Sequence, residues 1–584
     1  MEKDDKNIEK VRHSLAHILA LTVKGKWEDT KLGMGPAIEN GFYYDFEFQK
    51  HTPSPEDLPK LEDDIKNLIK QGMQFTREKI TKEEAEKIFK NEPYKLELIN
   101  ELAQKDDNIS IYRSGELVDL CRGPHIESTK EINTEAFHLT KIAGAYWKGD
   151  ENNQMLTRIY GVAFETKKEL DDYLKMIEEA EKRDHRKLGK DLDLFTFSNL
   201  VGSGLPLFTP KGALLRDLIG EKIYEIQSKS KFDYKKVWIP HIAKKDLYEI
   251  SGHWDKFKEN LFHVKGKSDT EFVMKPMNCP HHTQIYASSP KSYRDLPVRF
   301  VEITTNYRDE QPGELLGLSR VRSLTQDDGH IFCAIGQVEE EVKNIISVIR
   351  EFYTLLGMFD TKDYWVSLSI RDSKAPESYI GDEKNWTEAE RILEKVATDE
   401  NLNYKKIEGE AAFYGPKLDF MFKDSLGREW QLATIQVDFS MPARFELKYT
   451  DKDGIIKTPV MIHRAIAGSL ERFLSVIIEH FAGEFPLWLS PAQAIIIPVS
   501  EKFNAYGEEV LSKLKENNIR VEIDISNDTL GKRIRGAEIK KIPYILVVGA
   551  KEEENKTISV RSREKGDEGA TETDKFINNI LKKI

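Results

Sequence analysis

The sequence predicts a multidomain α+β protein, and three observations support this fold class. The chain has 584 residues, which corresponds to about four domains at roughly 150 residues each. Between Asp191 and Phe485, short β-rich segments punctuated by Gly and Pro cluster together, with helical segments set apart, which is typical of an antiparallel α+β domain. After Pro486 and Pro491 strands alternate with helices, which predicts a small α/β unit.

Composition and charge exclude several classes of protein. With 39% hydrophobic and 32% charged residues, the chain is too apolar to be disordered. No segment approaches the ~18 consecutive apolar residues of a membrane-spanning helix, and the charged N-terminus is unlike a signal peptide, so we expect a cytoplasmic protein with no membrane partner. Three cysteines form no disulfide framework, which leaves reduced thiols or metal ligands. The net charge of −12 limits nucleic-acid contacts to local basic patches.

The N-terminal segment, residues 1–165, mixes helical and strand patterns and contains two pairs of metal-ligand residue types. His13 and His17 are four residues apart and therefore share one face of a helix, and Cys121 and His125 repeat this spacing. The four side chains can form a tetrahedral zinc site, or a metal-free hydrolytic pocket in which imidazoles hold a water. Core histidines satisfied by hydrogen bonds are the third interpretation.

Residues 166–190 form a charged linker, for which we expect one helix from Lys167 to Lys190. A solvated charged face is the alternative role for its basic residues. Residues 191–487 form the middle domain, with a helix expected at Val338–Phe359. Its expected strands are Val237–Pro240, Glu271–Met274, Val298–Thr305, Trp365–Ile370 and Trp430–Phe439.

Two motifs in this domain suggest phosphate chemistry. Arg308, Glu310 and Arg320 place two guanidinium groups and a carboxylate around a strand–loop–strand. Guanidinium groups bind phosphates bidentately, and a carboxylate can accept from an amino group or hold Mg²⁺. In the second motif, Gly468 and Ser469 permit close approach of a ligand, and Arg472 begins a helical apolar pattern. Taken alone, an Arg-x-Glu pattern is weakly specific, because ion pairs on strands are common.

Residues 488–584 form the C-terminal unit. We expect strands at Ala494–Val499, Arg520–Asp524 and Tyr544–Val548, and helices at Asn504–Asn517 and Leu530–Lys541. The second helix region carries five basic residues, Lys532, Arg533, Arg535, Lys540 and Lys541. Such a face can hold phosphates or be solvated surface.

These motifs, together with Met274–His282 and Thr325–His330, resemble in order and spacing the bacterial threonyl-tRNA synthetases, a family of class II aminoacyl-tRNA synthetases. The resemblance extends from about His13 to the C-terminus. It implies an N-terminal α+β editing domain, a class II catalytic core with an antiparallel sheet, and a C-terminal α/β anticodon-binding domain. It also implies a homodimer, with Val237–Pro240 as the first class II motif, and no DNA partner. The family's small N-terminal ubiquitin-like domain is expected to be absent.

The implied activity is ATP-dependent activation of L-threonine and its transfer to tRNA(Thr), with hydrolysis of Ser-tRNA(Thr). The resemblance implies one Zn²⁺ per chain, held by Cys279, His330 and His463, and Mg²⁺ bound with ATP. The implied activation residues are Arg308, Glu310, Arg320 and Arg472. The implied substrate-binding residues are Met277, Gln326, Asp328, Tyr414, Lys417, Gln431 and Gln436.

The resemblance also implies two RNA-related sites. The editing residues are His13, His17, Lys95, Tyr112, Asp119, Cys121 and His125, in a metal-free pocket, although a related alanyl-tRNA synthetase domain uses such a set for metal. The anticodon-contacting residues are Asn527, Arg535, Glu552 and Arg561.

One chemical argument explains why the chain would need both a synthetic site and a hydrolytic site. Threonine can coordinate an open zinc through its amino and hydroxyl groups, whereas valine lacks the hydroxyl; a site that demands a polar contact rejects the analogue lacking it by roughly 10⁴-fold or more. Serine keeps both groups and will be activated, so a hydrolytic site is needed. This chain departs from the family at His281, usually Gly, and at Leu324, often an aromatic residue that stacks on adenine. The rival functions are an RNA-binding regulatory paralogue and a hydrolase of mischarged tRNA; neither should show threonine-dependent ATP–pyrophosphate exchange.

Overall fold

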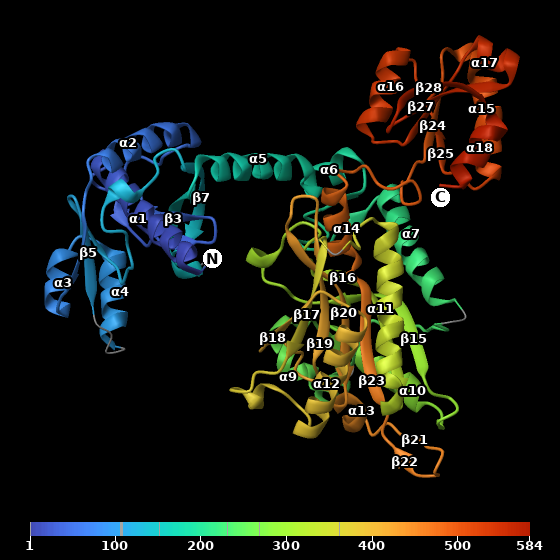
Figure 1. Ribbon diagram of the computed structural model, residues 1–584, viewed down its shortest axis with the longest axis horizontal. Coiled ribbons are helices and arrows are strands. Elements are labelled where there is room, and N and C mark those ends of the chain that lie inside the picture. The colour runs from blue at the N-terminus through green and yellow to red at the C-terminus, as the bar shows by residue number, and fades with distance from the viewer. Residues whose placement is uncertain are drawn as a thin grey trace. The chain divides into compact units, whose positions relative to one another are not determined.

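The computed structural model describes residues 2–104, 109–150, 152–229, 232–267, 269–360 and 362–583. The chain forms two compact units, residues 1–178 and 179–584 (Figure 1). Within the described part of the chain, no helix is both long and apolar enough to cross a membrane.

In the first unit, the long helix α1 (Glu2–Lys26) packs on a mixed-length antiparallel sheet. Leu15, Ile18 and Leu19 of α1 are fully buried, because apolar residues at this spacing form one face. The sheet has the order β1 (Lys31–Leu32), β3 (Gly41–Glu47), β8 (Met155–Ala163), β7 (Phe137–Tyr146), with β2 (Ala37–Ile38) paired to β3 and α2 (Leu58–Lys70) packed beside α1. A second sheet consists of β4 (Phe75–Lys79), β5 (Ser110–Ser114) and β6 (Leu117–Leu120), accompanied by α3 (Lys82–Ile88) and α4 (Pro93–Gln104).

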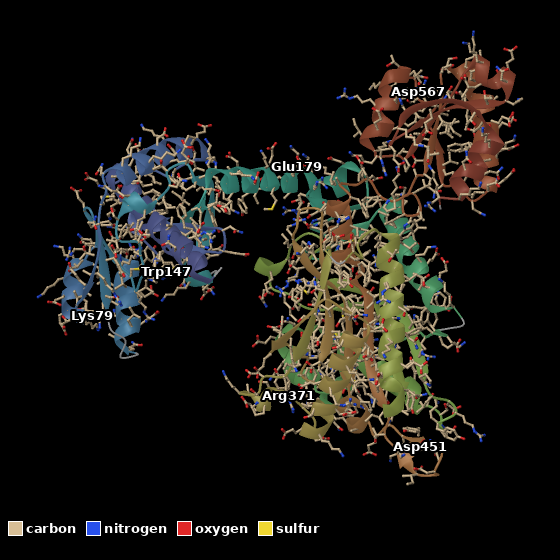
Figure 2. The ribbon with its side chains drawn as sticks, in the orientation of Figure 1. Lys79, Trp147, Glu179, Arg371, Asp451 and Asp567 are labelled. Carbon is tan, nitrogen blue, oxygen red and sulfur yellow. The ribbon has the colours of Figure 1, made fainter. Side chains whose placement is uncertain are left out.

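The linker differs from the expected single helix. Helix α5 (Lys167–Arg183) ends before Asp184, whose backbone has ψ 121°, and α6 (His185–Asp191) begins after it. The Asp184 side chain accepts a hydrogen bond from the backbone N–H of Arg186 at 2.8 Å and so caps α6. Figure 2 marks Glu179 on α5, where it forms an ion pair with Lys182 at 3.0 Å.

The second unit is built on an eight-stranded sheet. Its order is β11 (Lys235–Lys236), β15 (Val298–Tyr307), β16 (Ser323–Cys333), β23 (Val460–Ser469), β20 (Glu429–Asp438), β19 (Lys417–Lys423), β17 (Tyr364–Ile370) and β18 (Tyr404–Glu408). All neighbouring strands are antiparallel except the two edge pairs, which confirms the predicted α+β class. One core joins this sheet to α7 (Pro210–Gln227), α11 (Val338–Leu355), α12 (Glu383–Asp399) and α14 (Leu470–His480) (Figure 1).

The expected strand Val237–Pro240 is wrong. The strand at this place is β11, which ends at Lys236. Beyond Val237, the backbone N–H of Ile239 donates to the Glu302 side chain at 3.0 Å instead of to a backbone carbonyl, and Pro240 has no N–H to donate. The ladder therefore cannot continue.

Smaller elements complete the second unit. They comprise a three-stranded sheet of β12 (Ile242–Lys244), β14 (Glu271–Met274) and β13 (His263–Lys265), the helices α8 (Lys245–Ser251), α9 (His253–Phe257), α10 (Cys279–Ala287) and α13 (Ser440–Arg444), and the two-stranded pairs β9 (Phe195–Thr196) with β10 (Leu207–Phe208) and β21 (Tyr449–Thr450) with β22 (Ile456–Lys457).

The C-terminal part contains the expected strands and helices in order. They are β24 (Ala494–Pro498), α15 (Asn504–Glu516), β25 (Val521–Ile523), α16 (Leu530–Ile539) and β26 (Tyr544–Val548), with β24 parallel to both β25 and β26. The structure adds α17 (Ala550–Asn555), β27 (Thr557–Ser562), β28 (Gly566–Glu572) and α18 (Thr573–Leu581). These two extra strands are antiparallel, so the sheet is mixed.

Candidate functional site

The register of the eight-stranded sheet brings polar residues from four strands into one row. His330 on β16 pairs with His463 on β23, His463 pairs with Gln436 on β20, and Gln436 pairs with Lys417 on β19. Paired residues on neighbouring strands lie about 5 Å apart and point to the same face. Two predicted metal-binding residues, His330 and His463, and two predicted substrate-binding residues, Gln436 and Lys417, therefore lie on one face of the sheet.

Cys279, His330 and His463 form a compact group of potential metal ligands. One donor atom of each lies within 4.8 Å of the others, and all three side chains are buried. His330 Nε2 and His463 Nδ1 face each other at 3.1 Å. At zinc–nitrogen bonds of about 2.1 Å, tetrahedral geometry places two nitrogens about 3.4 Å apart, so this spacing fits zinc.

The remaining nitrogens of both histidines have partners that orient the rings. His463 Nε2 lies 3.1 Å from Asp438 Oδ2, and His330 Nδ1 lies 2.7 Å from His282 Nδ1. Metal-binding histidines usually have such a partner on their other nitrogen. Burial lowers the pKa of His330 well below its ordinary value, so the ring is neutral and can donate a lone pair. The set of one thiol and two oriented imidazoles fits a zinc ion with an open position.

The predicted substrate residues surround this group, with one exception. Tyr414 stacks on the His463 ring at 4.8 Å, and its hydroxyl donates to Gln436 Oε1 at 2.5 Å. The other predicted residues in the group have the following partners: Asp328 accepts from Asn278 at 2.8 Å, Gln326 accepts from Asn306 at 2.5 Å, and Lys417 pairs with Asp419 at 2.5 Å. Gln431 is exposed and lies beyond a β-bulge on β20, away from the row.

The predicted phosphate-binding residues lie at the ends of β15, β16 and β23. Arg308 follows β15; its Nη2 contacts the Met277 sulfur at 3.0 Å, and its buried Nε has no hydrogen-bond partner among the described residues. Burial lowers the pKa of Arg308, and the positive charge of Arg472 lowers it further, while the charge of Glu310 offsets part of this effect. This half-buried guanidinium, with an Nε that lacks a partner among the described residues, is suited to an anionic ligand.

Glu310 and Arg320 form a second part of this region. Arg320 donates to Glu310 Oε2 through Nη2 at 2.7 Å and through Nε at 3.1 Å. Arg472, near the start of α14, donates from Nε to the backbone oxygen of Ser319 at 3.1 Å, in the turn that precedes Arg320. The three arginines therefore converge from two chain segments on one region.

The structure shows where His281 and Leu324, the two residues that depart from the family pattern, are located. It also reveals a residue near the ligand group that the sequence did not predict. His281 is buried but lies outside the compact ligand group, so it does not replace Cys279 there. Leu324 is buried on β16, opposite Asn306. His253, at the start of α9, was not predicted; its Nε2 lies 3.5 Å from Cys279 Sγ. Its only sequence signal is the preceding Gly252, which has φ 83° and turns the chain between α8 and α9.

All seven predicted editing residues belong to one interconnected cluster in the first unit. Cys121 Sγ lies 3.3 Å from both His13 Nε2 and His125 Nε2, and the His125 ring lies 4.4 Å from that of Tyr112. One donor atom from each of His13, His17, Cys121 and His125 lies within 4.8 Å of the others. The set comes from α1 and from the segment that follows β6, which explains how pairs a hundred residues apart meet.

A buried ion pair adjoins this cluster. Lys95 on α4 contacts Asp119, which also accepts from the Tyr44 hydroxyl at 2.7 Å and lies 3.6 Å from His17 Nε2. Burial opposes the Asp119 charge, but Lys95 and His17 outweigh it, so the pKa of Asp119 is lowered. Burial lowers the pKa of His17 to about 4 and raises the pKa of Cys121 to about 11. The imidazole is therefore neutral at physiological pH, and its Nδ1 has no hydrogen-bond partner among the described residues.

The predicted anticodon residues lie in the C-terminal part. Asn527 and Arg535 are exposed, before and within α16, beside a cavity of about 660 Å³. Glu552 accepts from Ser559 at 2.8 Å, and Arg561 is half-buried on β27. The expected basic face of α16 is smaller than the sequence indicates, because Arg533 is buried and donates to the Asp524 carbonyl at 3.1 Å.

Three protein-family models match the chain. The tRNA synthetase class II core domain (G, H, P, S and T) matches residues 262–481, and the anticodon binding domain matches residues 493–583. The threonyl and alanyl tRNA synthetase second additional domain matches residues 109–160.

Curated relatives cover nearly the whole chain. A threonine–tRNA ligase of Gloeobacter violaceus is 49% identical over 574 residues, which is 97% of this chain and 90% of the relative. A threonine–tRNA ligase of Thermus thermophilus is 46% identical and covers 100% of this chain and 89% of its own length. Among solved structures, the RNA binding domain of threonyl-tRNA synthetase from Cryptosporidium parvum Iowa II has a TM-score of 0.64 at 36% identity, covering 68% of this chain and 98% of its own.

Proposed function

The chain belongs to the threonine–tRNA ligase family, and from this membership we propose which of its residues perform each step. The protein activates L-threonine with ATP and transfers it to tRNA(Thr); class II chemistry uses Mg²⁺ with the ATP. The observation that carries the residue assignment is the row of His330, His463, Gln436 and Lys417 on one face of the sheet, next to three converging arginines.

We infer that Cys279, His330 and His463 hold one zinc ion per chain. A zinc ion bound there would supply a Lewis acid that accepts the amino and hydroxyl groups of threonine. Around it, the Tyr414 ring covers His463 and Asp328 presents a buried carboxylate oxygen that can accept from an ammonium group. Gln436 accepts a hydrogen bond from the Tyr414 hydroxyl, and this bond fixes the orientation of both side chains. The open position of such a zinc ion, which valine cannot fill, would make the site require a hydroxyl.

Arg308 and Arg472 act on the phosphates. The buried, unpaired Nε of Arg308 and the exposed guanidinium of Arg472 can bind opposite sides of a triphosphate. Their charge stabilises the transition state in which the threonine carboxylate attacks the α-phosphate and pyrophosphate departs. Glu310, oriented by Arg320, can accept a hydrogen bond from the adenine amino group.

We further propose that the first-unit cluster hydrolyses Ser-tRNA(Thr) without a metal. The four donor atoms are close enough for a cation, but Lys95 neutralises the Asp119 carboxylate, and burial raises the pKa of Cys121 to about 11, so the cluster offers no uncompensated negative charge to a metal ion. Neutral His17, with a free Nδ1 and a carboxylate behind Nε2, can hold a water and receive its proton as that water attacks the ester carbonyl.

We also propose a cytoplasmic homodimer with no DNA partner, whose interface includes the segment around Pro240. Trp238 is 76% exposed and the nearby Ile303 is 37% exposed, an apolar surface suited to a second copy. Trp238→Glu should shift the sedimentation profile from dimer to monomer. An unchanged dimer would remove this segment from the interface.

The central test is ATP–pyrophosphate exchange with threonine, measured before and after zinc removal. We expect exchange with threonine, weaker exchange with serine, none with valine, and loss of exchange after chelation. An RNA-binding paralogue or a pure hydrolase would show no exchange. For the second site, His13→Ala/His17→Ala should form Thr-tRNA normally but accumulate Ser-tRNA(Thr). Normal clearance of Ser-tRNA(Thr) by this variant would contradict the editing assignment.

A further inference from the structure

His185, the first residue of α6, lies in a buried network that none of the steps above uses. Its ring and the Glu479 side chain are both buried. His185 Nδ1 lies 2.6 Å from Glu479 Oε1 near the end of α14, and the backbone N–H of His185 donates to the same oxygen at 3.0 Å. The other ring nitrogen, Nε2, accepts a hydrogen bond from the backbone N–H of Leu318 at 3.1 Å. These partners define one tautomer, with the proton on Nδ1.

The Leu318 turn touches the phosphate-binding residues on its other side. Ser319 follows Leu318, and its backbone oxygen accepts from Arg472 Nε at 3.1 Å, while its hydroxyl lies 2.9 Å from that of Ser475 on α14. Arg320, the next residue, is paired with Glu310. The His185 imidazole therefore binds the backbone of Leu318, which directly precedes the Arg472 contact and the Arg320–Glu310 pair of the proposed ATP site.

The turn and the ring are also fitted to each other sterically. Gly317 has φ 48°, and a Cβ at this position would lie 2.2 Å from His185 Nε2. Leu318 is fully buried, so an amide deprived of the imidazole would have no solvent to bind. On the far side, Arg428 binds the second oxygen of Glu479 at 2.5 Å, which keeps that carboxylate directed at His185.

We propose that His185 is a positioning residue for adenylate formation, which acts by holding the Leu318–Arg320 turn so that Arg472 and the Arg320–Glu310 pair keep their places. The inference rests on the proposed assignment of those residues to ATP. Loss of the Nε2 acceptor frees the Leu318 amide and displaces the turn, and small displacements of catalytic groups cost activity steeply. Threonine binding and editing involve other residues and should be unaffected.

The test compares two substitutions, each of which replaces the function of a different ring nitrogen of His185. His185→Asn retains a donor near Nδ1 but loses the acceptor, whereas His185→Gln can place its oxygen near Nε2. In pyrophosphate exchange, His185→Asn should lower kcat/KM for ATP about 10-fold to 100-fold while the KM for threonine and the zinc content stay the same. His185→Gln should restore most of this loss. Hydrolysis of Ser-tRNA(Thr) should be unchanged in both.

Gly317→Ala is the second variant, because it presses on the same contact without removing the histidine; it should show the same ATP-selective loss. Normal ATP kinetics in both His185→Asn and Gly317→Ala would overturn the inference. Equal losses in His185→Asn and His185→Gln, affecting ATP and threonine alike, would also overturn it by showing a general role in stability. Absence of threonine-dependent exchange in the unsubstituted protein would instead overturn the proposed function.

Discussion

Cys279 contributes the thiol among the three proposed zinc donors. Cys279→Ser replaces it with a hydroxyl, a poor zinc ligand, so bound zinc and threonine activation should both be lost. The measurements are metal content by elemental analysis and threonine-dependent exchange. His281→Gly is the matched control and should keep both, because His281 lies outside the ligand group. Full zinc content in the Cys279 variant would contradict the ligand assignment.

Arg308 and Arg472 belong to a different step. Arg308→Ala and Arg472→Ala should each reduce the rate of adenylate formation by several orders of magnitude, because both remove positive charge where pyrophosphate charge develops. Affinity for tRNA, measured by filter binding, should stay near that of the unsubstituted protein. If either variant exchanged pyrophosphate normally, the phosphate site would lie elsewhere.

His17 gives a prediction about pH. Its pKa is lowered from 6.5 to about 4 by burial, so it stays neutral between pH 5 and 7, where a free imidazole would be partly protonated. Hydrolysis of Ser-tRNA(Thr) should therefore persist as the pH falls from 7.5 to about 5. The lowered folded-state pKa also means that the unfolded chain binds more protons below pH 6.5, so stability of this unit should fall as the pH falls toward 4. Loss of hydrolysis with a midpoint near 6.5 would show that His17 is accessible to protons.

The break in the linker is a property of secondary-structure elements. Asp184 caps α6, and Asp184→Ala should lower the free energy of unfolding by about 1 kcal/mol. Asp184→Asn keeps a capping oxygen and should cost little. Chemical denaturation of the two variants measures the difference. Equal stability of the two variants would show that the cap contributes nothing.

The number of zinc ions bound per chain tests the proposed metal content of both units together. We expect about one zinc per chain, in the second unit, and none in the first, whose cluster is adjoined by the Lys95 ammonium. Cys279→Ser should therefore contain almost no zinc, whereas His13→Ala/His17→Ala should retain a full equivalent. Two zinc ions per unsubstituted chain, or chelator-sensitive hydrolysis of Ser-tRNA(Thr), would contradict the metal-free pocket.

Much of the chemistry was readable from the linear order of residues. Several local patterns show which side-chain atoms are available for binding. They are Cys279 with its flanking motif, Arg308 with Glu310, and the pairs His13/His17 and Cys121/His125. Strand positions such as Glu271–Met274 were also predicted correctly, since alternation and turn residues act over a few neighbours.

Only the tertiary structure determined which of these residues lie together and which are buried, because both depend on contacts between segments distant in the sequence. The row of His330, His463 and Gln436 arises from strand register, and a shift by one residue would turn each side chain to the other face. The same reasoning explains the burial of Arg533, which a helical charge count assigns to the surface, and the end of β11 where the Glu302 side chain replaces a backbone acceptor. His185 was unnoticed for this reason: its partners lie more than 130 residues away, and no pattern of neighbours along the chain records them.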